Sequence, residues 1–346
     1  MRAEICSRAK AYEPLAFATS FAGMAWNSPK PRAAGLTGRP GETIRKSGLS
    51  PWAALLHWCG MNRRSALAAL ATAATGGLSQ SLAGDEPYRI TNGRIKQSVV
   101  LWCFNPMPVE ELARHAAAMG LKSVELCDPV HWPMLKELGM TCAIAGSHGF
   151  AKGFAHREEW PECHAKLRER IGQCADFGVG RVITFSGYRR GISDDEGIAN
   201  MVAGLKELVP LAEEKKVTIC IEMLNSRVNI NMKGHPDYFC DSIERTVEIC
   251  KRIGSPRVKL LFDIYHVQIM QGDLIKRIHE HKDWIAHVHT AGNPGRAEID
   301  NTQEINYPPL MKALLEIGYE GYVGQEFIPT HDKIASLAQG VKICDV

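Results

Sequence analysis

The sequence predicts a single α/β domain, a (β/α)8 barrel, over residues 84–346, and three observations carry this prediction. Short β-rich runs alternate with longer amphipathic runs from residue 98 to the end of the chain. The β-rich runs are almost continuously apolar, which is typical of a parallel sheet covered by helices on its outer face. The length of this region suits one barrel, which takes roughly 250 residues. An open doubly wound sheet would carry a Gly-x-Gly-x-x-Gly motif after its first strand, and the sequence has none there.

We expect eight strands and eight helices in alternation. Glycines such as Gly120, Gly178 and Gly254 follow the predicted helix ends, where a left-handed backbone is needed. Prolines stand near several predicted helix starts, where the missing N–H costs nothing. The predicted strands are 98–104, 123–126, 141–145, 181–185, 217–222, 258–263, 285–290 and 322–326. The predicted helices are 109–119, 132–138, 160–177, 194–214, 236–253, 273–281, 307–316 and 332–346.

A leader precedes the barrel. Residues 1–60 show no helical or strand period, and we expect a disordered segment or a mis-annotated extension of the gene. Residues 61–83 have a basic start, a short Ala- and Leu-rich stretch and a small-residue cleavage site, the layout of a signal peptide. The adjacent Arg63 and Arg64 resemble a twin-arginine export signal. The apolar stretch falls short of the ~20 residues that span a bilayer.

Translation is therefore expected to begin at Met61, followed by export to the periplasm and no stable membrane insertion after cleavage. If the signal does not act, the protein stays in the cytoplasm. The alternative for residues 61–83 is an amphipathic or disordered tail in which the two arginines are adjacent by chance.

Charge is unevenly distributed along the chain. Of the 41 Lys and Arg and 38 Asp and Glu residues, 10 and 3 lie in residues 1–83, which leaves 31 basic and 35 acidic residues for 84–346. A body with a charge of about −4 is a poor surface for nucleic acid, since phosphate binding needs clustered Lys and Arg. The 11 cysteines include no Cys-x-x-Cys pair, and we expect most of them to be free and buried.

The last four predicted strands each end near an ionisable residue: Glu222, Asp263, His289 and Glu326. Any one of them alone could be a helix cap or a core histidine. In a barrel, however, the carboxyl ends of the strands meet at one mouth, where catalytic residues lie. Three carboxylates there would repel one another unless a cation neutralised them. Their oxygens with one imidazole suit one divalent metal ion, Mn²⁺, Mg²⁺, Co²⁺ or Fe²⁺.

Five segments near these residues resemble hydroxypyruvate isomerase, a family of the xylose isomerase-like TIM barrels that stands beside ketose 3-epimerases and inosose-processing enzymes. The resemblance covers about residues 98–330, and its sharpest motifs are 221–225, 262–268, 287–296, 304–307 and 324–327. It implies the metal ligands Glu222, Asp263, His289 and Glu326, with Glu222 and Glu326 also forming the catalytic acid–base pair. Hydroxypyruvate isomerases usually have Gln where this chain has His289, and His is usual in the ketose epimerase branch. The substrate therefore stays open.

The expected reaction removes a proton α to a carbonyl and proceeds through an enediolate, on a small sugar or keto acid. An isomerase returns the proton to the neighbouring carbon, whereas a 3-epimerase returns it to the opposite face. A homo-oligomer is compatible with the sequence. The residues expected to bind substrate are His266, Arg296, Asn225, Glu304 and His148, each of which could instead cap a helix, form a turn or stay in a loop.

Alternatives to the isomerase remain. The same metal barrel serves lyases such as an inosose dehydratase, and relatives that cleave DNA at abasic sites. The second of these needs additional metal ligands and a basic face, and the negative charge of the body argues against it. A non-catalytic sugar-binding barrel is the alternative of another class, although the chain retains both glutamates, Asp263 and His289.

Overall fold

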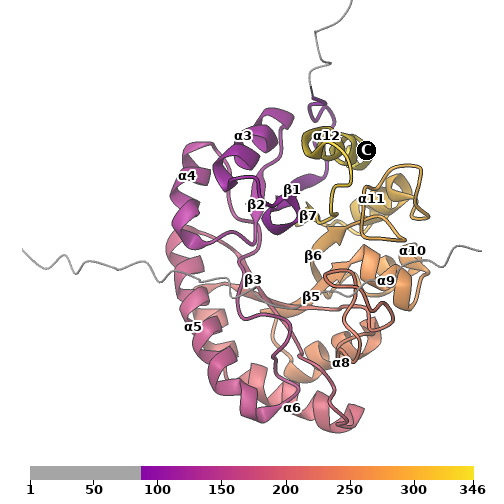
Figure 1. The fold of residues 1–346 in the computed structure, drawn as a ribbon. Coiled ribbons are helices and arrows are strands. Elements are labelled where there is room, and N and C mark those ends of the chain that lie inside the picture. The colour runs from indigo at the N-terminus through magenta and orange to yellow at the C-terminus, as the bar shows by residue number, and fades with distance from the viewer. Residues whose placement is uncertain (1–86) are drawn as a thin grey trace, which may run out of the picture. The chain divides into compact units, whose positions relative to one another are not determined.

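The computed structural model describes residues 87–346, in which a parallel sheet is rolled into a barrel with helices around its outside (Figure 1). The strand order is β2-β1-β7-β6-β5-β4-β3, and every pairing is parallel. The predicted leader lies outside the described residues, so its export signal stays a prediction. The strands are β1 (Lys96–Val100), β2 (Ser123–Glu125), β3 (Arg181–Thr184), β4 (Thr218–Glu222), β5 (Val258–Asp263), β6 (Ile285–Thr290) and β7 (Tyr322–Gln325).

Helices follow the strands and cover the outer face of the sheet (Figure 1). Three of them have the bounds predicted from sequence, namely α3, α5 and α11. Short 3-10 helices lie at Leu101–Phe104, Pro129–His131 and Arg157–Glu159. The helices are α3 (Val109–Met119), α4 (Trp132–Glu137), α5 (Trp160–Phe177), α6 (Asp194–Lys206), α7 (Val209–Lys215), α8 (Ile243–Ile253), α9 (Ile264–Met270), α10 (Leu274–Glu280), α11 (Tyr307–Glu316) and α12 (Lys333–Cys344).

The barrel prediction is confirmed as an α/β barrel with a parallel sheet, but the predicted strand 141–145 is not regular. This segment joins β2 through a bridge between Thr141 and Ser123, and it joins β3 through a bridge between Ala145 and Val182. In its middle, the N–H of Ala143 donates to the side-chain oxygen of Ser123 in β2 at 2.7 Å instead of to a backbone carbonyl of a neighbouring strand. The segment therefore closes the barrel between β2 and β3 without forming a full ladder.

Other predicted bounds need correction for local reasons. The predicted strand 98–104 ends at Val100 and turns into a 3-10 helix, since a short apolar run does not distinguish a strand from a buried helix. The predicted helix 236–253 begins only at Ile243, because Ser242 caps it by accepting the N–H of Arg245. The predicted helix 194–214 is divided into α6 and α7, with Pro210 in the first turn of α7.

The interior of the barrel and the space under the helices form one apolar core. The nine cysteines of the described region are free and buried, as expected. Within residues 87–346, no helix combines the length and the apolar character needed to cross a bilayer. The barrel interior also holds buried polar side chains, including Ser98, Glu125, His287 and His289. Burying a polar group without a partner is costly in free energy, so these buried polar residues indicate a functional site.

One carboxylate ties the two ends of the barrel domain together at the side away from these residues. Asp345 accepts hydrogen bonds from the backbone N–H groups of Thr91, Asn92 and Gly93 at 2.7–3.0 Å, and from the hydroxyl of Tyr88 at 2.8 Å. Burial alone would raise the pKa of Asp345, but these hydrogen bonds outweigh it and lower the pKa to about 2. The charged form of Asp345 therefore stabilises the fold.

We expect Asp345→Asn to lower the free energy of unfolding at pH 7 by about 1.5–3 kcal/mol, since an amide nitrogen would face backbone donors. A carboxylate with a depressed pKa stabilises the fold above its unfolded pKa of about 3.9, and this stability is lost as pH falls toward 2. Urea midpoints of both proteins at pH 7 and pH 3 test this: the difference should shrink at pH 3. Equal midpoints at pH 7 would contradict the role of Asp345.

Candidate metal centre and active site

The four ionisable residues at the strand ends meet at the mouth of the barrel. Glu222 and Asp263 are the last residues of β4 and β5, His289 stands one residue before the end of β6, and Glu326 directly follows β7. The parallel register pairs Asp263 with His289 and His289 with Gly324, which sets these positions at one height. All four side chains are buried, and one ligand atom of each lies within 4.8 Å of the others. The structure therefore brings the four together.

The donor atoms of this cluster fit a divalent metal ion. Among the described residues, Glu222 Oε1 and Asp263 Oδ2 are buried and have no hydrogen-bond partner, and His289 Nδ1 has one close contact, with Glu326 Oε2 at 2.9 Å. A buried polar atom left without a partner costs about 1–3 kcal/mol, so the two carboxylate oxygens need another source of stabilisation. Two carboxylate oxygens and an imidazole nitrogen are suitable ligands for Mn²⁺, Mg²⁺, Co²⁺ or Fe²⁺.

One buried cation adjoins the cluster. Arg296 Nη2 lies 2.6 Å from Glu326 Oε2 and 3.6 Å from Asp263 Oδ2. Its guanidinium lies over the rings of Trp102 and Tyr265, at 5.1 and 5.7 Å from their centroids. Aromatic faces at this distance stabilise a cation. Arg296 therefore acts on Glu326 as a fixed counter-charge.

The carboxylates differ in how readily they carry charge. Burial would raise the pKa of Glu326, but His289 and Arg296 outweigh it and hold the pKa well below its usual range. Burial raises the pKa of Asp263 to about 8, although Arg296 opposes this. Burial also raises the pKa of Glu222, again against the neighbouring His289. Glu326 is therefore the carboxylate that ionises most easily, whereas Glu222 and Asp263 need a further positive charge to be ionised together.

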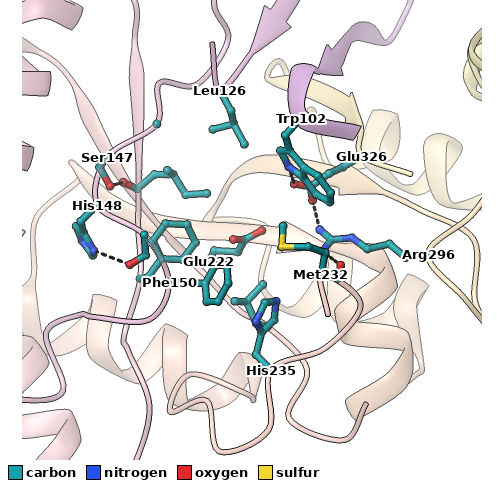
Figure 2. Close-up of a pocket in the computed structure, with 15 residues that line it drawn as sticks. Trp102, Leu126, Ser147, His148, Phe150, Glu222, Met232, His235, Arg296 and Glu326 are labelled. Carbon is teal, nitrogen blue, oxygen red and sulfur yellow. Dashed lines mark hydrogen bonds and ion pairs between the residues drawn. The ribbon is translucent and has the colours of Figure 1, made fainter. Parts of the chain in front are cut away.

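A pocket of about 220 Å³ opens beside the cluster. Glu222 and Glu326 line it, whereas Asp263 and His289 are not among its described lining residues. Figure 2 shows Glu222 in the middle of the pocket, between Phe150 and the group formed by Trp102, Arg296 and Glu326. The lining residues are Trp102, Leu126, Gly146, Ser147, His148, Gly149, Phe150, Ile183, Phe185, Glu222, Leu224, Met232, His235, Arg296 and Glu326.

Two of the five predicted substrate residues, Arg296 and His148, lie in this pocket wall. Two nitrogens of Arg296 already donate within the protein, Nη1 to the carbonyl of Met232 at 2.7 Å and Nη2 to Glu326, whereas Nε has no partner among the described residues. His148 has both ring nitrogens engaged, Nε2 with Thr184 Oγ1 at 2.9 Å and Nδ1 with its neighbour's carbonyl at 3.2 Å. Both residues therefore shape the wall through contacts inside the protein.

The other three predicted substrate residues are not among the described residues that line the pocket. Asn225 accepts the N–H of Val228 at 3.1 Å and donates to the carbonyl of Lys233 at 2.9 Å, so its side chain holds the loop after β4. His266, on α9, is buried; its Nδ1 accepts the N–H of Asn225 at 3.1 Å, and its Nε2 lies 3.6 Å from Asp263 Oδ2.

Glu304, for which the sequence left a loop role open beside substrate binding, makes loop contacts in the structure. It is exposed, and its carboxylate accepts hydrogen bonds from Asn293 Nδ2 and, at 3.2 Å, from Gln268 Nε2. These contacts close the loop after β6 onto α9 rather than reaching Arg296 or the pocket. The physical reason is direction: the side chain of Glu304 points along the outer surface of the loop, which motif spacing does not specify.

The structure also adds residues that sequence reasoning missed. Trp102 donates from Nε1 to Glu326 Oε1 at 3.1 Å, and His235 and Phe150 line the pocket in mutual contact, with ring centroids 4.3 Å apart. Glu125 and His287 lie beneath the cluster, with His287 Nε2 at 2.6 Å from Glu125 Oε2. Two signals pointed to this pair: Glu125 is an acid inside an apolar strand run, and His287 precedes His289 by two residues on one strand face.

The fold and the site together define an α/β barrel whose mouth carries a buried carboxylate–histidine cluster compatible with a metal ion, beside a small pocket. The chain belongs to the xylose isomerase-like TIM barrel family, whose model matches residues 113–343.

Similar proteins of known name include isomerases. The chain is 28% identical over 245 residues to a human protein named putative hydroxypyruvate isomerase, covering 69% of this chain and 81% of that protein. It is 29% identical over 235 residues to the 2-oxo-tetronate isomerase of Cupriavidus necator, covering 64% of this chain and 88% of that protein.

Solved structures agree in fold. The crystal structure of a family 2 AP endonuclease from Brucella melitensis has a TM-score of 0.64 at 26% identity, covering 71% of this chain and 98% of that one. A D-psicose 3-epimerase has a TM-score of 0.57 at 15% identity, covering 72% and 94%, and this likeness concerns the fold alone.

Proposed function

We propose that the protein is a divalent-metal-dependent isomerase of a small sugar or keto acid, similar to hydroxypyruvate isomerase, that works through an enediolate. One observation carries the proposal. Of the four clustered residues, Glu222 and Glu326 line the pocket, whereas Asp263 and His289 are not among its described lining residues. Two carboxylates facing a substrate, backed by a metal-type cluster, are the arrangement that proton transfer next to a carbonyl requires.

Each residue of the cluster would have a specific role in the reaction. Glu222, Asp263, His289 and Glu326 would hold the metal ion, which supplies Lewis-acid stabilisation of the charge that develops on the substrate oxygens. Glu222 and Glu326 exchange the proton on carbon, one removing it and one returning it. Arg296 keeps Glu326 ionised and in place through the contact of 2.6 Å.

Much of the pocket wall is apolar. Trp102, Phe150 and Phe185 give it aromatic surface, and Leu126 and Leu224 add aliphatic surface, so a substrate that fills the pocket would displace water from it. A dry pocket strengthens each electrostatic contact and protects a reactive enediolate from solvent protons.

A ketose 3-epimerase is the second candidate, and the pocket wall favours it. Among the described lining residues, Arg296 is the one Lys or Arg, and its guanidinium is already paired with Glu326. A keto acid presents a carboxylate, which is best bound by a free guanidinium or ammonium. A ketose presents hydroxyls and apolar C–H faces, which suit an aromatic wall.

A solvent-exchange assay tests the proposal. The full-length protein, loaded with Mn²⁺, Mg²⁺ or Co²⁺, is incubated in deuterated water with hydroxypyruvate, a panel of ketoses and a panel of inososes. We expect deuterium to enter the carbon next to the carbonyl of one substrate class. In an aldose or aldehyde product the label identifies an isomerase, and in a C3-inverted ketose it identifies an epimerase. Exchange with none of the panel would favour the lyase or sugar-binding alternatives.

A further inference from the structure

A second group of polar side chains lies inside the barrel, next to the metal-type cluster. Its centre is Glu125, the last residue of β2, which is fully buried. His287 Nε2 lies 2.6 Å and His289 Nε2 3.1 Å from Glu125 Oε2, and the hydroxyl of Ser98 donates to Oε1. Three donors from β1 and β6 therefore hold one carboxylate.

The contact with Glu125 gives the two nitrogens of the His289 ring different surroundings. Nε2 faces Glu125, whereas Nδ1 faces the other cluster, at 2.9 Å from Glu326 Oε2 and 3.7 Å from Glu222 Oε1. A neutral imidazole carries its proton on one nitrogen and a lone pair on the other. When Nε2–H donates to Glu125, the lone pair is on Nδ1 and points at Glu222 and Glu326.

The neighbouring strand leaves room for the carboxylate. Gly324 on β7 pairs in register with His289, and a Cβ at this position would stand 2.7 Å from Glu125 Oε1 and 2.9 Å from His289 Cδ2. Contacts of this length are not found for real side chains, so any larger residue would displace Glu125 or His289. Residues of four strands, β1, β2, β6 and β7, therefore determine the position of the Glu125 side chain.

A second metal site is the alternative interpretation of this group, since Glu125, His287 and His289 offer three ligand atoms close together. Its hydrogen bonding argues otherwise. Both oxygens of Glu125 have donors within the described chain, at distances normal for hydrogen bonds to Oε2. By contrast, the cluster at the mouth leaves Glu222 Oε1 and Asp263 Oδ2 without a hydrogen-bond partner among the described residues.

We propose that Glu125 is a positioning residue for His289: it binds Nε2–H and thereby presents the Nδ1 lone pair to the metal ion held at the mouth, while Ser98 and His287 hold Glu125. A carboxylate behind a metal-binding histidine fixes the ring and raises its basicity. The inference rests on the proposed metal-dependent function, but it concerns metal affinity rather than the reaction.

The test compares Mn²⁺ affinity by calorimetry in the full-length protein at constant pH. We expect Glu125→Ala to weaken binding by about 100-fold, the upper end of the usual effect of losing such a partner. Glu125→Gln keeps an acceptor oxygen and should weaken it by about 10-fold. Ser98→Ala, which removes one support of Glu125, should cause a smaller loss in the same direction.

Asp345→Asn is the matched control, because it removes a buried carboxylate far from the mouth; it should lower thermal stability and leave Mn²⁺ affinity unchanged. A second readout is the ¹⁵N NMR signal of the His289 ring in Mg²⁺-loaded protein, which should show one ring state with the proton on Nε2 in the wild type and an additional ring state in Glu125→Ala. If Glu125→Ala does not fold, Glu125→Gln and Ser98→Ala decide.

Three results would overturn the inference, and they are distinguishable from one another. Affinities within twofold of the wild type in all folded variants would show that His289 needs no support from Glu125. Two Mn²⁺ ions per chain, with one lost in Glu125→Gln, would make Glu125 a ligand. A wild-type protein that binds no divalent ion would remove the proposed function and this inference with it.

Discussion

Glu222→Gln and Glu326→Gln are each expected to reduce turnover by at least 10²–10⁴-fold, the contribution typical of a positioned acid–base group. Both residues line the pocket, so each loses its proton-transfer group at the position where the substrate lies. Glutamine has nearly the same shape as glutamate, which keeps the pocket intact. Steady-state rates on the substrate identified by deuterium exchange provide the measurement.

The two variants also separate the candidate reactions. In an epimerase that uses one glutamate on each face, each variant should still exchange the proton of one epimer and lose exchange with the other. In an isomerase, exchange and turnover should fall together. Metal content must be measured in both variants, since loss of the ion would mimic loss of the base. Asp345→Asn serves as the control, and wild-type rates in either glutamate variant would refute the pair.

The second large effect concerns the metal ion. A ligand that binds only the folded state stabilises it by RT ln(1 + [L]/Kd), about 2.7 kcal/mol at a concentration of 100 Kd. For a domain of this size, each kcal/mol raises the melting temperature by roughly 2–4 °C. We therefore expect Mn²⁺ or Co²⁺ to raise the melting temperature of the chelator-treated protein by about 5–11 °C and to restore its activity.

Asp263→Asn should abolish this thermal shift. Asp263 Oδ2 is buried and has no hydrogen-bond partner within the described chain, and burial raises the pKa of Asp263 to about 8 although Arg296 lies 3.6 Å away, so its charge is costly without the metal ion. Removing that charge should leave the metal-free protein as stable as the wild type or more so. A metal-induced shift of wild-type size in this variant would exclude Asp263 as a ligand.

Local pattern explains which parts of the fold were predictable. Helices α3, α5 and α11 and strands β5 and β6 have the predicted bounds, because their apolar period is continuous and turn or capping residues end it. The errors lie where an apolar run is short or where a cap stands inside a helical pattern. Trp102 was placed in a strand and belongs to a 3-10 helix, and residues 236–242 were placed in a helix and precede its cap at Ser242.

In the candidate site, too, the local sequence pattern predicted some features and tertiary contacts decided the others. By itself, the sequence determined the α/β barrel, the family and the four residues at the strand ends, because strand order along the chain and the position of a residue at a strand's end are one-dimensional properties. Tertiary structure decided which way side chains turn from those positions. In the folded barrel, Glu304 and Asn225 make hydrogen bonds within loops, and Arg296 pairs with Glu326.

Tertiary structure also placed Glu125 behind His289, across 164 positions of sequence. Such a pairing depends on the closure of the barrel, which brings β2 and β6 to face each other across its interior, and on the space that Gly324 leaves. Closure and free volume are properties of the packed barrel, so sequence spacing contains no signal for them.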